Sequence, residues 1–104
     1  MVRVIAEVTF SPLGTATPSL SRYVVAALAA LKDNPKVEYK LNAMGTVLEG
    51  ERADIIEAVE AMNEAIFAAG ALRVGTTLKI DERRDKLASM DHKVDTVMEG
   101  LYKA

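Results

Sequence analysis

The distribution of apolar and polar residues along the 104-residue chain predicts alternating strands and helices. Residues 2–10 alternate between apolar and polar side chains, as a half-buried β-strand does. The same alternation recurs over residues 37–44, 46–49 and 73–81. The first two of these segments flank Gly45, which is typical of a turn, so together they predict a β-hairpin.

Three other segments carry apolar residues every three or four positions, the spacing of an amphipathic helix. Thr17-Pro18 predicts the start of the first helix, with a hydroxyl N-cap and proline at the first helical position. Its predicted stripe is Leu20, Val24, Leu28 and Leu31. The second helix is predicted to bury Ile55, Val59, Met62 and Ile66, with Ile56 and Phe67 widening the stripe and Gly70 as the C-terminal cap. The third stripe is Leu87, Met90, Val94, Val97 and Leu101.

The predicted order is therefore β-α-β-β-α-β followed by a C-terminal helix. This is the ferredoxin-like pattern, an α+β fold with an antiparallel sheet and two helices on one face. Right-handed crossovers place the first and third strands in the middle of the sheet, and the second and fourth at its edges. Because the chain is short and has no internal linker, we expect a single domain over residues 1–104.

The sheet face that the two internal helices leave open is the informative one. It carries Glu7 and Glu49 on the two central strands. One interpretation is a solvated face of mixed charges, where each ion pair contributes less than about 1 kcal/mol. The other is a polar pocket that forms once the last helix or a second subunit covers the face. The apolar and weakly polar members of the face favour the second interpretation: Ile5, Met44, Val47 and Thr77.

The stripe of the last predicted helix is only one helix wide. Such a helix packs either on its own sheet or on a neighbouring subunit, and the sequence leaves both alternatives open. The two edge strands also invite pairing between subunits. Two-fold oligomers are the commonest assemblies of small domains, so we expect self-association.

Composition removes several classes of chemistry. The chain is 50% apolar and 27% charged, as a packed globular domain is, and its formal net charge of −2 disfavours nucleic acid as a partner. Cysteine is absent and His92 is the single histidine, which excludes disulfides and thiolate chemistry and leaves little for a metal site. No stretch approaches about 18 uncharged apolar residues, so we expect no membrane span and a cytoplasmic location.

Candidate catalytic groups are few. An acid–base site would use Glu7 and Glu49, but no nucleophile with its base accompanies them, so a structural ion pair is the better interpretation. The loop 11–15 offers backbone amides to an anion but lacks the lysine of a P-loop, and a plain connector fits equally well. Arg83-Arg84 is interpreted as a solvated turn rather than a phosphate clamp.

Three segments carry a resemblance to a known family: residues 6–14, residues 39–50, and residues 73–86 followed by Ser89-Met90. The combination of MGT…EG at 44–50 with LKIDERRDK at 78–86 is specific. On these segments the chain resembles the thiamine-binding-protein family, which is related to the hydroxymethylpyrimidine/thiamine-binding proteins of the YkoF type.

The resemblance implies a ferredoxin-like subunit that forms dimers with extended sheets and commonly a homotetramer. It also implies a protein that binds thiamine or its hydroxymethylpyrimidine moiety, with no reaction catalysed and no cofactor. The alternative is a structural or regulatory oligomerisation domain that takes no small molecule.

An aminopyrimidine needs an acceptor for its exocyclic amine and donors for its ring nitrogens, and suitable residues lie near one end of the central strands. The predicted ligand-binding residues are Glu49, Thr46, Asn42, Thr9, Ser11 and Glu7. Strict alternation puts Thr46 and Glu49 on opposite faces of their strand. Both therefore contribute only where a pocket wraps around the strand end or where a kink at Gly45 intervenes.

Overall fold

The computed structural model describes residues 3–86 and 89–103. Its elements follow the order β1 (Arg3–Pro12), α1 (Ser21–Leu31), β2 (Glu38–Asn42), β3 (Gly45–Glu51), α2 (Arg52–Ala68), β4 (Val74–Asp81) and α3 (Met90–Lys103). Val2 and Leu87, which the pattern assigns to the first strand and the last helix, lie outside the described residues.

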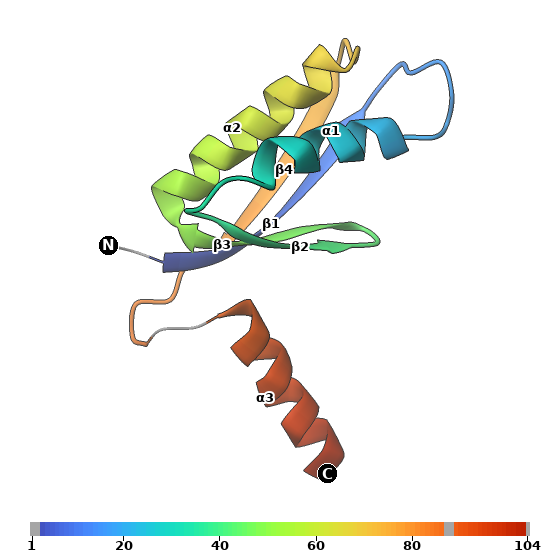
Figure 1. The fold of residues 1–104 in the computed structure, drawn as a ribbon. Helices are drawn as coiled ribbons and strands as arrows, with labels where there is room; N and C mark the ends of the chain where they lie inside the picture. The colour runs from blue at the N-terminus through green and yellow to red at the C-terminus, as the bar shows by residue number, and fades with distance from the viewer. Residues whose placement is uncertain (1–2, 87–88, 104) are drawn as a thin grey trace.

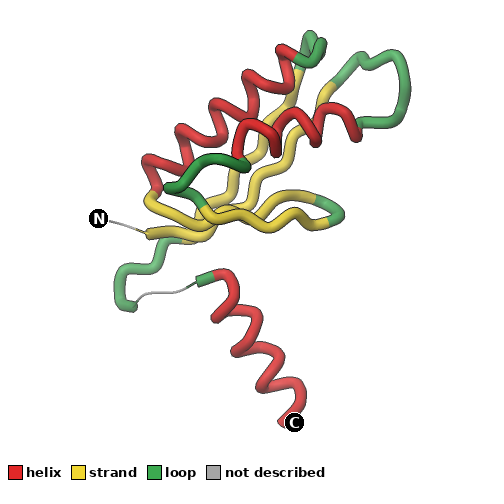
Figure 2. Tube along the Cα trace, in the orientation of Figure 1, coloured by secondary structure: helices red, strands yellow, loops and turns green. Residues whose placement is uncertain are grey.

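The four strands form one antiparallel sheet in the order β2-β3-β1-β4. This confirms that the first and third strands are central and that the ferredoxin-like α+β prediction is right. The helices α1 and α2 lie side by side on one face of the sheet (Figure 1). The third helix extends away from the other side (Figure 2). We call the face under α1 and α2 the helix face, and the opposite one the open face.

The hydrophobic core lies between the sheet and the two helices α1 and α2. The inward residues of β1 and β3, above all Val8 and Leu48, are almost fully buried against it. The predicted stripe of the second helix is confirmed, since all of its members are buried: Ile55, Val59, Met62 and Ile66. The prediction that Ile56 and Phe67 widen this stripe is wrong, because their exposed fractions are 42% and 38%.

The first helix begins later than predicted, and its predicted stripe is confirmed in part. It starts at Ser21, and the Thr17 hydroxyl donates to the Ser19 carbonyl of the loop instead of capping a helix. Of the predicted stripe, Leu31 is buried and Leu20 and Leu28 pack against the core, whereas Val24 is 43% exposed. The other buried residues of the helix are Tyr23 and Ala27. The small side chain of Ala27 allows α1 to pack closely against α2, which brings Tyr23 and Ala27 into the core beside Leu31.

Two glycines are required by the local geometry. Gly45 is the first residue of β3, after a turn at residues 43–44, and a Cβ there would lie 2.9 Å from Thr9 Cγ2. The glycine therefore allows β3 to approach β1 closely. Gly70 has φ +114° and its amide donates to the Phe67 carbonyl at 3.0 Å, which confirms the predicted helix cap.

Two neighbouring isoleucines of α2 test this description of the core. Ile55→Ala removes a fully buried side chain and is expected to lower the free energy of unfolding by about 2–5 kcal/mol. Ile56→Ala makes the same chemical change on the exposed side of the helix and is expected to cost less than about 1 kcal/mol. Urea unfolding of the two variants measures both values, and equal losses would contradict the assigned helix face.

Candidate functional site

The six predicted ligand-binding residues do not share one surface. Thr46 lies on the helix face and is buried. Strand register places the other five on the open face: Glu7, Thr9, Ser11, Asn42 and Glu49. The expectation that Thr46 and Glu49 lie on opposite sides of β3 is therefore confirmed.

Glu49 is a buried carboxylate at the base of α3. Its side chain is only 4% exposed, and its Oε2 accepts a hydrogen bond from the Arg3 guanidinium at 2.6 Å. Its Oε1 accepts the backbone amide of Met90, the first residue of α3, at 2.7 Å. Since both oxygens are engaged, the carboxylate joins the sheet to the positive end of the last helix.

These contacts set the ionisation of Glu49. Burial by itself raises the pKa of this carboxyl, but the Arg3 guanidinium and the Met90 amide outweigh it, so the pKa lies below its ordinary value of 4.5. Glu49 is therefore charged at neutral pH, and its charge is balanced by Arg3 on the neighbouring strand.

Two exposed ion pairs hold the first turns of α3 beside the sheet. Lys40 of β2 pairs with Asp91, and Lys93 pairs with Asp81 at the end of β4. Between α3 and the sheet lies a cavity of about 260 Å³, which we call the open-face cavity. It is lined by Ile5, Lys40, Asn42, Val47, Met90, Lys93 and Val94.

The remaining predicted residues are spread along the open face. Asn42, opposite Gly45 at the hairpin end, lines the open-face cavity. Glu7 lies between Val47 and Lys79 and is exposed, and Thr9 lies opposite Thr77 on β4. Ser11 is opposite Gly75, beyond the end of the hairpin. The register thus brings Asn42 to a cavity and leaves Glu7, Thr9 and Ser11 on an open surface.

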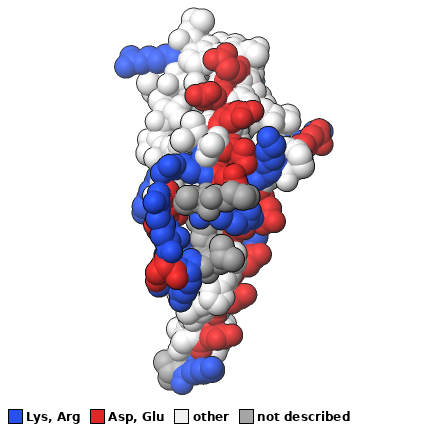
Figure 3. Space-filling model, turned by 90° about the vertical axis from the view of Figure 1, so that its left-hand side faces the viewer, with Lys and Arg blue, Asp and Glu red and all other residues white. Residues whose placement is uncertain are grey.

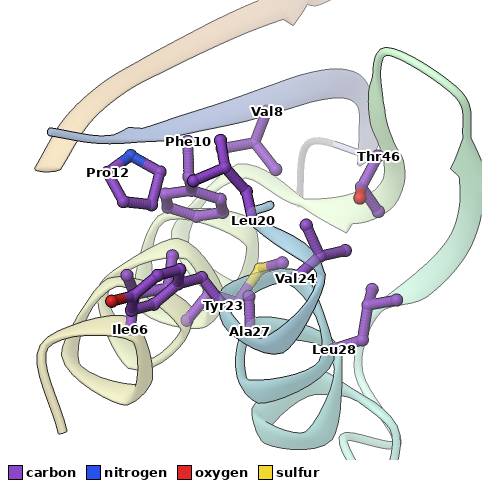
Figure 4. A pocket seen from close by; sticks show the side chains of 11 residues that line it. Val8, Phe10, Pro12, Leu20, Tyr23, Val24, Ala27, Leu28, Thr46 and Ile66 are labelled. Atoms are coloured by element: carbon purple, nitrogen blue, oxygen red, sulfur yellow. The ribbon is translucent and has the colours of Figure 1, made fainter. Parts of the chain in front are cut away.

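A second cavity lies on the other side of the sheet, between β1, α1 and α2. This helix-side pocket has a volume of about 80 Å³ and is almost wholly apolar. It is lined by Val8, Phe10, Pro12, Leu20, Tyr23, Val24, Ala27, Leu28, Thr46, Met62 and Ile66. Figure 4 shows Thr46 at one end of the pocket and the rings of Phe10 and Tyr23 at the other. The exposed side chain of Val24 marks where it reaches the surface.

Sequence reasoning missed most of this pocket. Phe10 shares its face with the core residue Val8, and Tyr23 precedes Ala27 by one helical turn, so both were interpretable only as core. A pocket forms because Ala27 is too small to fill the space between the helices and the sheet. The signal was a small residue, Ala27, one helical turn after the aromatic Tyr23, and it can be recognised only once the helix face is known.

The other candidate groups are held by neighbours. Arg83 pairs with Asp85 at 2.6 Å, and Arg84 pairs with Glu82 at 2.5 Å, consistent with a solvated turn. Within residues 3–86 and 89–103, no three His, Asp or Glu side chains gather as a metal site would require. No helix in this part of the chain is long and apolar enough to cross a membrane.

The fold and its cavities define a small ferredoxin-like domain with an apolar pocket on the helix side of its sheet. The family model described as "Thiamine-binding protein" matches residues 6–98, so the chain belongs to that family. The chain is 50% identical over 97 residues to a UPF0045 protein of Methanothermobacter thermautotrophicus, covering 92% of this chain and 97% of that protein. It is 40% identical to the UPF0045 protein YqgV of Bacillus subtilis over 93% and 96% of the two chains.

Solved structures agree with the fold. The protein MJ1052 of Methanocaldococcus jannaschii superposes with a TM-score of 0.82 at 39% identity, covering 95% of this chain and 99% of that one. A Thermotoga maritima protein described as a candidate thiamine biosynthesis/salvage protein superposes with a TM-score of 0.76. That match covers 91% and 98% of the two chains at 18% identity, so it supports the shared fold alone.

The Glu49 contacts predict a pH-dependent attachment of α3. Because the folded pKa is lowered, the stabilisation by the carboxylate is complete above its unfolded value of about 4.5 and is lost as the pH falls below it. Glu49→Gln keeps an acceptor oxygen but removes its negative charge, which weakens the bond from the Met90 amide, so exchange of that amide should accelerate about 10-fold at neutral pH.

Hydrogen exchange followed by NMR measures this effect, and the difference between the two proteins should shrink below pH 4.5. Glu7→Gln, on the exposed part of the same face, is the matched control and should leave Met90 exchange unchanged. If the Met90 amide exchanges at the same rate in the wild type and in Glu49→Gln, the bond to Glu49 does not hold the start of α3, and the prediction is wrong.

Proposed function

We propose that this protein binds thiamine, or its hydroxymethylpyrimidine moiety, without converting it, and that it works as a homo-oligomer. The pyrimidine ring enters the helix-side pocket. The observation that carries this proposal is an apolar pocket with aromatic walls and one hydroxyl, Thr46, in a member of the thiamine-binding-protein family. Ligand sites commonly combine such apolar walls with a few polar groups that fix orientation.

The pocket suits one end of such a ligand. Its volume of about 80 Å³ is smaller than the roughly 150 Å³ of a cavity that holds benzene, so a ring enters edge first and keeps its substituents near the mouth. The rings of Phe10 and Tyr23 supply stacking or edge contacts for a flat heterocycle. The cationic thiazolium of thiamine, attached to the pyrimidine, stays at the surface where water solvates its charge.

Thr46 gives the pocket its polarity. A hydroxyl both donates and accepts, so it serves either a ring nitrogen or the exocyclic amine of an aminopyrimidine. Asn42, on the adjoining strand end, lies on the other side of the sheet. The Glu49 carboxylate, which the resemblance suggested as the acceptor, is already bonded to Arg3 and Met90. We therefore assign Thr46 the ligand contact and Glu49 the attachment of α3.

Binding without chemistry is supported by what lines the pocket. Its side chains include one hydroxyl and one phenol, and no carboxylate, imidazole or amine. Acid–base or nucleophilic catalysis needs a base within hydrogen-bond reach of the reacting atom. Glu7, the other carboxylate that an enzyme would use, lies on the opposite face of β1.

A pair of threonine variants tests which face binds the ligand. Thr46→Val keeps the shape of the side chain and removes its hydrogen bond, so the affinity for hydroxymethylpyrimidine should fall about 5- to 10-fold. Thr9→Val makes the same change on the open face and should leave the affinity unchanged. Isothermal titration calorimetry of both variants against thiamine and hydroxymethylpyrimidine measures these values.

A reversed result, with Thr9→Val weakened and Thr46→Val unaffected, would move the site to the open face. If neither compound gives heat or thermal stabilisation at millimolar concentration, the binding proposal is wrong, because a ligand of the native state must stabilise it. A ligand-free oligomerisation domain would then be the better description.

A further inference from the structure

Arg22 lies where its own helix disfavours a cation. It is the second residue of α1, in the first turn, where the helix dipole is positive and a basic side chain is unfavourable. Its guanidinium instead reaches the end of α2, where Nη2 donates a hydrogen bond to the Ala69 carbonyl at 2.5 Å. Ala69 caps α2, and the last carbonyls of a helix lack partners within it and carry partial negative charge. The arginine therefore joins the start of α1 to the end of α2.

The same guanidinium stacks on the ring of Tyr23. Its central carbon lies 4.9 Å from the centre of the ring, within the range of a cation–π interaction. Tyr23 is buried and forms one of the aromatic walls of the helix-side pocket. Arg22 is exposed and does not line the pocket itself. Its effect on a ligand therefore passes through the Tyr23 ring and the two helices.

Arg22 has different partners from the arginines that form ion pairs. Those arginines contact carboxylates, and they are Arg3, Arg52, Arg83 and Arg84. On the face shown in Figure 3, Lys and Arg side chains gather around the middle of the molecule beside acidic ones. They are sparse toward the top, where α2 ends (Figure 1). The contacts of Arg22 with a carbonyl and a ring hold two elements of the pocket rather than neutralise a carboxylate.

Gly70 leaves the space that the guanidinium occupies. A Cβ at this position would lie 2.8 Å from Arg22 Nη2, so a side chain there would push the guanidinium aside. The glycine also adopts a φ of +114°, which residues with a side chain rarely adopt. The residue that follows Ala69 therefore both ends α2 and makes room for the arginine.

These contacts lie at the aromatic end of the pocket. Ile66, which lines the pocket, lies three residues before Ala69 and so on the same side of α2. Tyr23 directly follows Arg22 on α1. The hydrogen bond from Arg22 to Ala69 thus fixes the separation of the two helices where Tyr23 and Ile66 line the pocket.

We propose that Arg22 is a positioning residue of the helix-side pocket, which holds the Tyr23 ring and the adjoining ends of α1 and α2 in place for a flat ring to bind. The inference rests on the proposed function for the ligand, whereas the effect of Arg22 on the Tyr23 ring does not depend on it. A side chain that is ordered before binding loses less conformational entropy when the ligand arrives. The affinity of the pocket therefore depends on a residue that does not line it.

Two substitutions of Arg22 and one control variant test this role. Arg22→Met keeps a long, unbranched side chain but removes the guanidinium. Flips of the Tyr23 ring should then accelerate about 5-fold, and the affinity for hydroxymethylpyrimidine should fall about 5-fold. Arg22→Lys keeps the charge but not the planar group that stacks, so it should recover part of the lost thermal stability while the affinity stays low. Lys32→Met removes a cation from the opposite end of α1 and should leave both ring flips and affinity unchanged.

Aromatic NMR relaxation measures the ring flips without ligand, with the exposed Tyr102 of α3 as an internal reference, and isothermal titration calorimetry measures the affinity. Circular dichroism checks that each variant folds, as expected at an exposed residue, and follows its thermal unfolding.

The proposal is overturned if either the ring flips or the affinity of Arg22→Met matches the wild type. Full recovery of affinity in Arg22→Lys would also overturn it, because charge alone would then suffice. If the Tyr23 ring flips faster in Arg22→Met but the wild type binds no hydroxymethylpyrimidine, the proposed function fails while the role of Arg22 in holding the ring stands.

Discussion

The pleat of β3 is the constraint on which both candidate surfaces depend. Successive side chains of a strand point to opposite faces, so Thr46 and Leu48 face the helices while Val47 and Glu49 face α3. Within four residues, β3 therefore supplies side chains to two different surfaces. One face completes the apolar pocket proposed for the ligand, and the other anchors the last helix.

Glu49 attaches the last helix to the sheet through a buried, charged carboxylate. A buried charge costs free energy unless it is paired, and this one is paired twice, with Arg3 from the adjacent strand and with the amide that opens α3. Because the carboxylate holds the helix at one end only, the rest of α3 stands clear of the sheet (Figure 1). Because α3 is attached only at its first turns, the apolar side chains farther along the helix stay exposed.

The sequence pattern predicted the strand order, the buried stripe of α2 and the cap at Gly70, because these follow from local periodicity and backbone freedom. For α1 it predicted Leu31 correctly but missed Tyr23 and Ala27, because the packing of α1 against α2 is long-range. The partners of Glu49 were invisible for the same reason, as Met90 lies 41 residues away along the chain. The placement of the six ligand candidates on two faces followed from alternation, whereas the pocket at Thr46 needed the helices in place.

The central claim is that the small molecule enters on the helix face of the sheet rather than on the open face. Side-chain methyl NMR during titration with hydroxymethylpyrimidine tests it most directly, because the two cavities are lined by different methyl groups. The account predicts shifts for Val8, Val24, Ala27 and Ile66, with Ile5, Val47 and Val94 unmoved. Shifts confined to Ile5, Val47 and Val94 would contradict it.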